Sequence, residues 1–287
     1  MKAVGVNRVL VVGAFAAALG LCSQSCPAGT LQIVHSIDFP FPEETISDLA
    51  WDGESLLFAI NWGLGAKIYA LRPGEGSTIR ERLPGGAVYY DGLAWDGRYL
   101  WATGQPAITA PAEKIADFIQ KIDANAMPGA LTSTYEAPHS PDAGQCGAAW
   151  DGAYLWLSDA NHGEIMQLDP TDMTVLRSFS SPGPMPLGLT WGRSSLWCVD
   201  GADNTVYQLD SSGNLIDTWS VPLTAPFGLA FDGDHLWMTD NDTRKIYQVA
   251  IPEPSSFRLL CVMSVTVLCF TWSRVRRATT MTTESVS

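Results

Sequence analysis

The chain has 287 residues, of which 46% are hydrophobic and 16% are charged, and its formal net charge at pH 7 is −13. This length allows one substantial core or two small ones. The acidic balance argues against nucleic acid and anionic lipid as partners, because both repel a negative surface. A cation or a neutral polymer such as a glycan is easier to accommodate.

Six cysteines are too few for a disulfide scaffold, since Cys22, Cys261 and Cys269 lie in the terminal apolar segments. For Cys146 and Cys198, a bridge and a pair of buried free thiols both remain open.

The N-terminus has the order of charge and hydrophobicity that is typical of a secretory signal peptide. Lys2 and Arg8 precede the apolar stretch Val9–Leu21. We therefore expect residues 1–28 to be a signal peptide, with cleavage between Ser25 and Thr30. The alternative, lipidation of Cys22, is disfavoured because the bulky Leu21 stands where a small residue is wanted.

The central segment, residues 30–251, repeats one phrase five times. In each copy an aromatic residue follows small and apolar residues and usually precedes Asp-Gly. The copies are Leu49–Gly53, Gly92–Gly97, Gly147–Gly152, Gly188–Gly192 and Gly228–Gly233. Their aromatic residues are 40 to 55 residues apart, close to the length of a four-stranded propeller blade.

Each phrase predicts a β-hairpin. Six residues after the aromatic residue stands another large apolar one: Leu57, Trp101, Trp156, Trp197 and Trp237. The intervening Asp-Gly predicts a type I′ turn, because glycine tolerates positive φ. Gly192-Arg193 should turn as well, though it is less well specified. Both faces of these strands are apolar, so we interpret the tryptophan rows as core and not as a ligand platform.

Two further segments complete each repeat. Third strands are expected at Lys67–Leu71, Phe118–Ile122, Ile165–Leu168, Val206–Leu209 and Ile246–Val249. Fourth strands, more polar as outer edges should be, are expected at Thr78–Arg82, Leu131–Tyr135, Val175–Phe179 and Leu215–Trp219. Since the last repeat has no fourth strand of its own, Leu31–Phe39 should supply it.

We therefore predict an all-β, five-bladed β-propeller that an N-terminal strand closes into a ring. A sixth, degenerate blade hidden in the long second repeat is the alternative.

The segment Gly228–Asp240, followed by Lys245–Gln248, resembles the repeats of the NHL, streptogramin-lyase and gluconolactonase propellers. The resemblance covers essentially all of residues 31–250 and implies blades, not an activity. The lyases of this group use a histidine with acidic metal ligands, and the lactonases use a Glu, Asn and Asp set across the central channel. Neither set maps onto this chain residue by residue. The acidic motif of the five-bladed bacterial glutaminyl cyclases is not evident either.

Loops between second and third strands, and the linkers between blades, should emerge on one face of the propeller, which we call the loop face. Candidate ligand-binding residues on it are Asp159, Asn161, His162, Asp200, Asp203, Asp240 and Asp242. Such oxygens suit calcium, but Asp and Asn also cap tight turns. Recurrence of the same Asp in successive repeats favours turns, so no metal is assigned. The role of the insertion Gly104–Lys114, as a lid or a docking loop, is open.

His139 and His162 are expected on the loop face of the third blade. They suit a base or a zinc ligand pair, but the sequence indicates no third ligand, and a solvated loop histidine is the commoner case. The chain has no Gly-x-Ser-x-Gly elbow, no phosphate-binding glycine loop before a helix and no His-Glu-x-x-His. We assign no catalytic residue.

The C-terminus holds the motif Pro252, Glu253 and Pro254, then the apolar run Leu259–Trp272, then Arg274, Arg276 and Arg277. It resembles the PEP-CTERM sorting signal of bacterial surface proteins, which a membrane protease, exosortase, recognises and processes. This implies a sorting signal over residues 252–277, followed by a polar tail, 278–287, that departs from the family pattern. The apolar run is shorter than the about 20 residues of a stable span, so we expect a transmembrane helix that inserts transiently in the inner membrane. An ordinary tail anchor is the alternative.

Two functions follow. The favoured one is an exported, non-catalytic binding or structural module at the cell surface or in the extracellular matrix. PEP-CTERM proteins are associated with exopolysaccharide and biofilm matrix, so the resemblance implies a module that binds glycan, protein or calcium through its loop face. The alternative is a secreted metal-dependent lyase or lactonase with its metal at the propeller axis.

Overall fold

The computed structural model describes residues 29–251 except 40, 42–43, 63–64, 75–77, 87, 107–115, 124–125, 127–129 and 141–143. For residues 61–62, 65, 78–86 and 145–146 it describes the backbone alone. The expected signal peptide, sorting signal and polar tail lie outside this range, and their boundaries stay predictions. Within the described range, no helix has the length and apolar character needed to cross a membrane.

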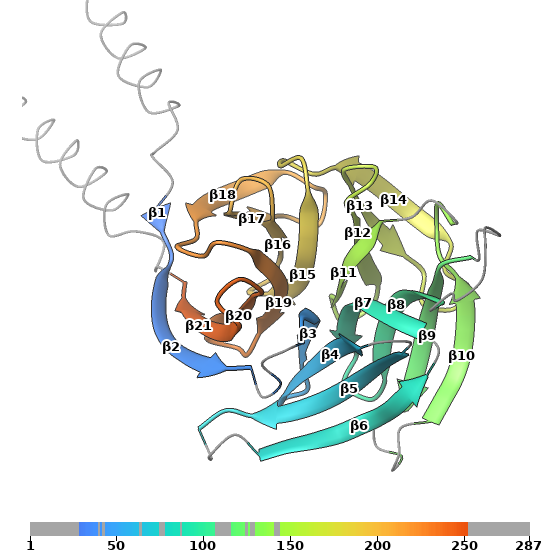
Figure 1. Cartoon of the computed structure of the whole chain (residues 1–287). Coiled ribbons are helices and arrows are strands. Elements are labelled where there is room, and N and C mark those ends of the chain that lie inside the picture. The colour runs from blue at the N-terminus through green and yellow to red at the C-terminus, as the bar shows by residue number, and fades with distance from the viewer. Residues whose placement is uncertain are drawn as a thin grey trace, which may run out of the picture. The chain divides into compact units, whose positions relative to one another are not determined.

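Five sheets surround a central axis, and each begins with a strand next to that axis (Figure 1). Blade 1 contains β3 (Ile46–Trp51), β4 (Leu56–Trp62), β5 (Gly65–Arg72) and β6 (Thr78–Gly86). Blade 2 contains β7 (Val88–Trp95), β8 (Leu100–Pro106), β9 (Phe118–Asp123) and β10 (Ala130–Glu136). Blade 3 contains β11 (Gln145–Trp150), β12 (Leu155–Asp159), β13 (Glu164–Leu168) and β14 (Val175–Ser180).

Blade 4 contains β15 (Pro186–Gly192), β16 (Ser195–Asp200), β17 (Thr205–Leu209) and β18 (Leu215–Ser220). Blade 5 contains β19 (Pro226–Phe231), β20 (His235–Asp240) and β21 (Lys245–Ala250), with β2 (Gln32–Asp38) as its outer strand. The five-bladed propeller is confirmed. The long second repeat forms a single four-stranded sheet, so the alternative of a sixth blade is wrong.

The N-terminal strand closes the ring as predicted. β2 pairs antiparallel with β21, from Gln32 opposite Ala250 to Asp38 opposite Lys245. Leu31 and Phe39, which flank β2, are buried. A contact that the sequence did not reveal is β1 (Gly29–Thr30), which adds to blade 4 as a parallel neighbour of β18. One N-terminal segment therefore joins blades 4 and 5.

The hairpin turns differ from the predicted type. In four blades the first central residue is a glycine with φ near +100°, as at Gly53, and the next residue does not have positive φ. Positive φ at the first central residue alone is the pattern of a type II′ turn. The turn of blade 4 is the exception. Its two central residues, Arg193 and Ser194, both have positive φ, 52° and 57°, which is the type I′ pattern. The type I′ turn thus occurs where the sequence lacks Asp-Gly.

The aspartate before each of these glycines explains the difference. In blade 1, Oδ1 of Asp52 accepts the backbone amides of Glu54 at 2.9 Å and Ser55 at 2.7 Å. Asp96, Asp151 and Asp232 make the same pair of bonds in blades 2, 3 and 5. The carboxylate therefore caps the turn from its first corner.

The second oxygen of this aspartate binds the core. Oδ2 of Asp151 accepts the indole N–H of the fully buried Trp156 at 2.8 Å. Asp96 with Trp101, and Asp232 with Trp237, repeat the bond at 2.9 and 2.8 Å. In blade 4 the carbonyl of Gly192 accepts the indole of Trp197 instead, and in blade 1 the equivalent residue is Leu57. One carboxylate thus positions both a turn and a core tryptophan.

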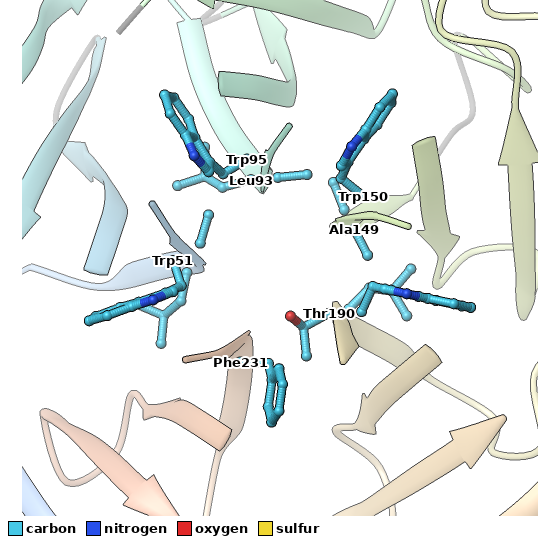
Figure 2. Close-up of a pocket in the computed structure, with 13 residues that line it drawn as sticks. Trp51, Leu93, Trp95, Ala149, Trp150, Thr190 and Phe231 are labelled. Carbon is cyan, nitrogen blue, oxygen red and sulfur yellow. The ribbon is translucent and has the colours of Figure 1, made fainter. Parts of the chain in front are cut away.

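Neighbouring blades pack through these aromatic residues. Trp150 of blade 3 stacks on Trp101 of blade 2, with ring centroids 6.4 Å apart and planes 10° apart, and Trp191 stacks on Trp156 in the same way. The rings of Trp51, Trp95 and Trp150, at the ends of the inner strands, point outward from the axis (Figure 2). The interpretation of the tryptophan rows as core is confirmed, and burial of each such side chain contributes roughly 1.5–3 kcal/mol.

A few apolar side chains of the outer strands are exposed, near the ends where these strands begin. Leu131, Leu176 and Leu215 are about half exposed, and so is Val34 on β2. Each stands near the start of an outer strand, where the blade has no further neighbour to cover it.

We expect Asp151→Ala to lower the free energy of unfolding by about 1–3 kcal/mol more than Asp52→Ala does, since an unpaired buried donor costs that much. Both substitutions remove the turn cap, but only the first leaves a buried indole N–H without its acceptor. Denaturant titration of the two variants measures the difference. Equal losses would show that the Asp–Trp bond adds nothing.

Candidate functional site

Four glycines and one aspartate face the propeller axis at one level of the inner strands. They are Gly92, Gly147, Gly188, Gly228 and, in blade 1, Asp48. The inner strands approach so closely that a Cβ on Gly147 would lie 2.4 Å from the carbonyl oxygen of Leu187 in blade 4. Likewise, a Cβ on Gly228 would lie 2.7 Å from the Cα of Asp48. Four of the five blades therefore have no room for a side chain at this level.

The Asp48 carboxylate fills the centre. It is fully buried and accepts the backbone amides of Leu93 in blade 2 at 2.8 Å and Leu229 in blade 5 at 3.1 Å. It also accepts the amides of Leu49 and, across the axis, of Ala148 in blade 3. Burial raises the pKa of Asp48 well above its ordinary value, and these amide bonds act in the opposite direction.

Sequence reasoning missed Asp48, although a signal was present. The phrase reads Gly-Leu or Gly-Ala before its aromatic residue in the other four copies and Asp48-Leu49 in the first. With four N–H groups directed at one carboxylate, a cation at this level would meet amide hydrogens, not lone pairs.

A small cavity lies at the other end of the inner strands, beside the hairpin turns (Figure 2). Its volume is about 70 Å³. Small residues such as Ala50 and Ala94 and the hydroxyl-bearing Thr190 line it, together with the aromatic residue of each inner strand: Trp51, Trp95, Trp150, Trp191 and Phe231. This volume holds a few water molecules. A sugar or peptide ligand does not fit, so we look for the functional site on the loop face.

Three predicted loop-face aspartates, Asp159, Asp200 and Asp240, are the last residues of β12, β16 and β20, and all three are fully buried. In each, Oδ1 accepts amides from the residues two and three positions on. Oδ2 of Asp200 accepts the amide of Met185, and Oδ2 of Asp240 accepts that of Thr224, both in the preceding linker. These carboxylates hold the loops in place, which is the turn chemistry that the sequence favoured.

The other predicted ligand-binding residues, Asn161, Asp203 and Asp242, are exposed and lie in three different blades. Asp203 accepts the hydroxyl of Tyr207 at 2.6 Å. Burial raises the pKa of Tyr207, and this bond raises it further. A ligand for the three residues stays a prediction.

Blade 3 departs from this pattern. Here the linker amide, from Gly144, bonds to Oδ1 of Asp159 at 3.2 Å, and Oδ2 faces two imidazoles. The Nδ1 atoms of His139 and His162 lie 3.0 and 2.9 Å from it, and the two rings are 4.4 Å apart between centroids. The third partner that the sequence did not indicate is thus Asp159. Burial raises the pKa of Asp159, but hydrogen bonds from His139, His162 and backbone amides outweigh burial and hold that pKa below its ordinary value.

A second titratable group that the sequence did not reveal is Asp91, near the loop-face end of β7. Burial raises its pKa to about 7, the bond from Gln105 opposes this shift, and the charge of Asp117 adds to it. Asp117 adjoins the blade 3 linker, since its backbone amide donates to Ser140 Oγ at 2.9 Å. The signal was available, because Asp91 immediately precedes the phrase glycine where other copies have Cys, Leu or Phe.

Two open questions from the sequence are partly answered. Cys198 is a buried free thiol, and burial raises its pKa. In the long insertion, Gly104, Gln105 and Pro106 belong to β8, whereas residues 107–115 lie outside the described residues.

Comparison with known proteins supports the fold. No family model matches the chain, and no curated protein matches it. Among solved structures, glutaminyl cyclase from Myxococcus xanthus is similar with a TM-score of 0.58 at 12% identity, covering 78% of this chain and 98% of that one.

A streptogramin B lyase structure is similar at 21% identity over 77% of this chain and 73% of that one, with a TM-score of 0.44. Virginiamycin B lyase from Staphylococcus aureus gives 19% identity over 74% and 68%, with a TM-score of 0.45. The similarity to glutaminyl cyclase supports the propeller fold, and at 12% identity it shows no activity.

At pH 4, where its raised pKa keeps Asp48 neutral, we expect Asp48→Asn to lower the free energy of unfolding by about 1–3 kcal/mol, because both oxygens of the acid accept amides and an asparagine offers only one acceptor. The amino group of Asn would face backbone N–H groups. Chemical denaturation at pH 4 measures the effect, and an unchanged or raised stability would contradict the role of Asp48 as the acceptor that joins the blades.

For Asp91→Asn we expect the opposite sign. Its raised pKa means that the folded state favours the protonated acid, so its stability contribution is complete below pH 4 and is lost as the pH rises through about 7. The variant should therefore match the native chain at pH 4 and exceed it at pH 8, by at most about 4 kcal/mol at 1.36 kcal/mol per pK unit. Unfolding free energies at the two pH values test this, and a gain that is equal at both would contradict it.

Proposed function

We propose that this chain is an exported β-propeller that acts as a non-catalytic binding or structural module at the cell surface or in the extracellular matrix. A secretory signal peptide directs its export, and an exosortase-type protease processes its PEP-CTERM-like signal after transient insertion in the inner membrane. Its partner is a surface glycan or a protein that the rigid loop face recognises.

The bonding of Asp48 is the observation that carries this proposal. An enzyme with its metal at the axis needs carboxylates with free lone pairs around the channel. Here the axial carboxylate accepts backbone amides, and the equivalent positions in the other blades are glycines. The axis therefore serves as a structural hub.

The loops support the same function. Both carboxylate oxygens of Asp200 and of Asp240 accept backbone amides. These bonds fix the loops that carry the exposed Asp203 and Asp242. Loops held rigidly by a scaffold are suited to recognition. The net charge of −13 favours a neutral polymer over an anionic one.

A secreted metal-dependent lyase or lactonase is the second candidate, and one observation favours it. Asp91, with a pKa of about 7, lies on the loop face in blade 2, and the His139, Asp159 and His162 cluster lies on that face in blade 3. Groups with shifted pKa values gather at catalytic sites, although structural networks also shift them. A reaction here would occur beside the axis and not on it.

In the producing cell, we expect the mature protein to begin between Ser25 and Thr30 and to end near Pro254. Intact-mass spectrometry and surface biotinylation measure both ends and the location. Glu253→Ala should accumulate chain that retains its C-terminal segment, because the motif that the protease reads is broken. Glu136→Ala, a charge removal on the outer strand β10, is the matched control and should be processed normally.

The binding role is checked on the same material. Purified envelope polysaccharide should retain the protein in co-sedimentation, and lactones, streptogramin B and peptides with N-terminal glutamine should not be turned over with or without divalent metal. Metal-dependent turnover would replace the proposal with the second candidate. A chain that keeps its C-terminal segment and stays in the inner membrane would instead favour an ordinary tail anchor.

A further inference from the structure

We propose that His139, Asp159 and His162 bind one transition-metal ion, with Zn²⁺ as the best fit. The inference goes beyond the proposed function and does not depend on it. We call these three residues the blade 3 cluster.

Its geometry places three ligand atoms together. Oδ2 of Asp159 lies 3.0 Å from Nδ1 of His139 and 2.9 Å from Nδ1 of His162, and the three candidate ligand atoms all lie within 4.8 Å of one another. The carboxylate is fully buried, whereas the two imidazole side chains are 37% and 41% exposed. An ion can therefore reach the cluster from solvent and meet an oxygen whose position is fixed.

The other blades show that the fold does not need these histidines. Asp200 and Asp240 cap the same turn in blades 4 and 5, and there the positions equivalent to His162 are Asp203 and Thr243. In those blades Oδ2 accepts a linker amide. In blade 3 the linker amide, from Gly144, bonds to Oδ1 instead, and Oδ2 faces the two imidazoles. Turn chemistry explains the aspartate but not the two histidines.

Two imidazole nitrogens and one carboxylate oxygen form a ligand set that suits zinc and disfavours calcium, which takes oxygen ligands. Metal–ligand bonds of 2.0–2.1 Å at tetrahedral angles place ligand atoms about 3.3 Å apart. The observed separations from Oδ2 are shorter by a few tenths of an ångström, so a small opening of the exposed rings suffices. The fourth position would face solvent and be open to water or an exogenous ligand.

Such an ion would join two loops of one blade. His139 lies in the linker that leads into β11, and His162 lies in the loop between β12 and β13. Because the ion binds the folded state, it would raise the melting temperature with rising metal concentration.

The experiment measures Zn²⁺ binding to the purified, metal-stripped full-length chain by competition with a chromophoric chelator. We expect one ion per chain with micromolar or tighter affinity. Loss of an outer-sphere partner alone weakens metal sites 10- to 100-fold, so His139→Gln and His162→Gln should each weaken binding by at least about 100-fold. Asp159→Asn keeps an oxygen for the turn amides and should weaken binding similarly.

His235→Gln is the matched control. His235 Nδ1 also faces an aspartate, at 3.6 Å from Asp232 Oδ2, but its other neighbour is the Gln248 side-chain amide, with Nε2 at 3.2 Å. This variant should bind Zn²⁺ like the native chain. Because each histidine also bonds to the buried Asp159, some loss of stability without metal is expected in either variant. A variant that keeps the native circular dichroism spectrum and has lost Zn²⁺ binding separates lost ligation from lost folding.

Three results would overturn the site: no Zn²⁺ bound by the native chain, binding that survives replacement of both histidines, or equal losses in His235→Gln. A fourth result would do the same: if a folded Asp159→Asn variant bound Zn²⁺ with native affinity, Asp159 would not be a ligand and the three-residue site would be wrong.

Discussion

Close approach of the five inner strands at the axis is the constraint on which the rest of the structure depends. Inner strands meet backbone to backbone, which only glycine permits at Gly92, Gly147, Gly188 and Gly228. Amides that face the axis have no further strand to pair with, and buried amides must find acceptors. The carboxylate of Asp48 supplies them for blades 1, 2, 3 and 5. One blade must therefore carry Asp48 where the other four carry glycine. This departure from exact repetition supplies the acceptor that the axial amides need.

Outside the hub, aspartates stabilise most of the turns that recur from blade to blade. An aspartate caps the hairpin and holds the core indole, and a second aspartate caps the loop after the second strand in blades 3, 4 and 5. A few titratable residues are not part of these recurring turns. Asp91, His139 and His162 have no counterpart in the other blades, and all three lie on the loop face of blades 2 and 3. The zinc site proposed above and the second candidate function rest on these three residues.

Much of the fold could be predicted from the sequence because it rests on local patterns. The phrase around Trp95 or Trp150 determines a hairpin, its spacing determines a blade, and the missing fourth strand of the last repeat determines the closure by Leu31–Phe39. What could not be predicted depends on contacts between blades or on backbone detail. The turn type follows from which atoms Asp52 caps, and the role of Asp48 requires the spacing across the axis. The partnership of Asp159 with two histidines depends on which of its oxygens the amide of Gly144 reaches.

The closure by β2 has a consequence for folding kinetics. Gln32 pairs with Ala250, so the contact that completes the ring joins nearly the two ends of the domain. Contacts between residues so far apart in the chain form late, because their loop-closure entropy is recovered only after the intervening blades have assembled. Until then β21 is an unpaired edge, ready to accept a strand from another molecule. Although β2 is synthesised before every strand of the five blades' inner rows, it is thus among the last to dock, and crowded nascent chains risk exchanging it.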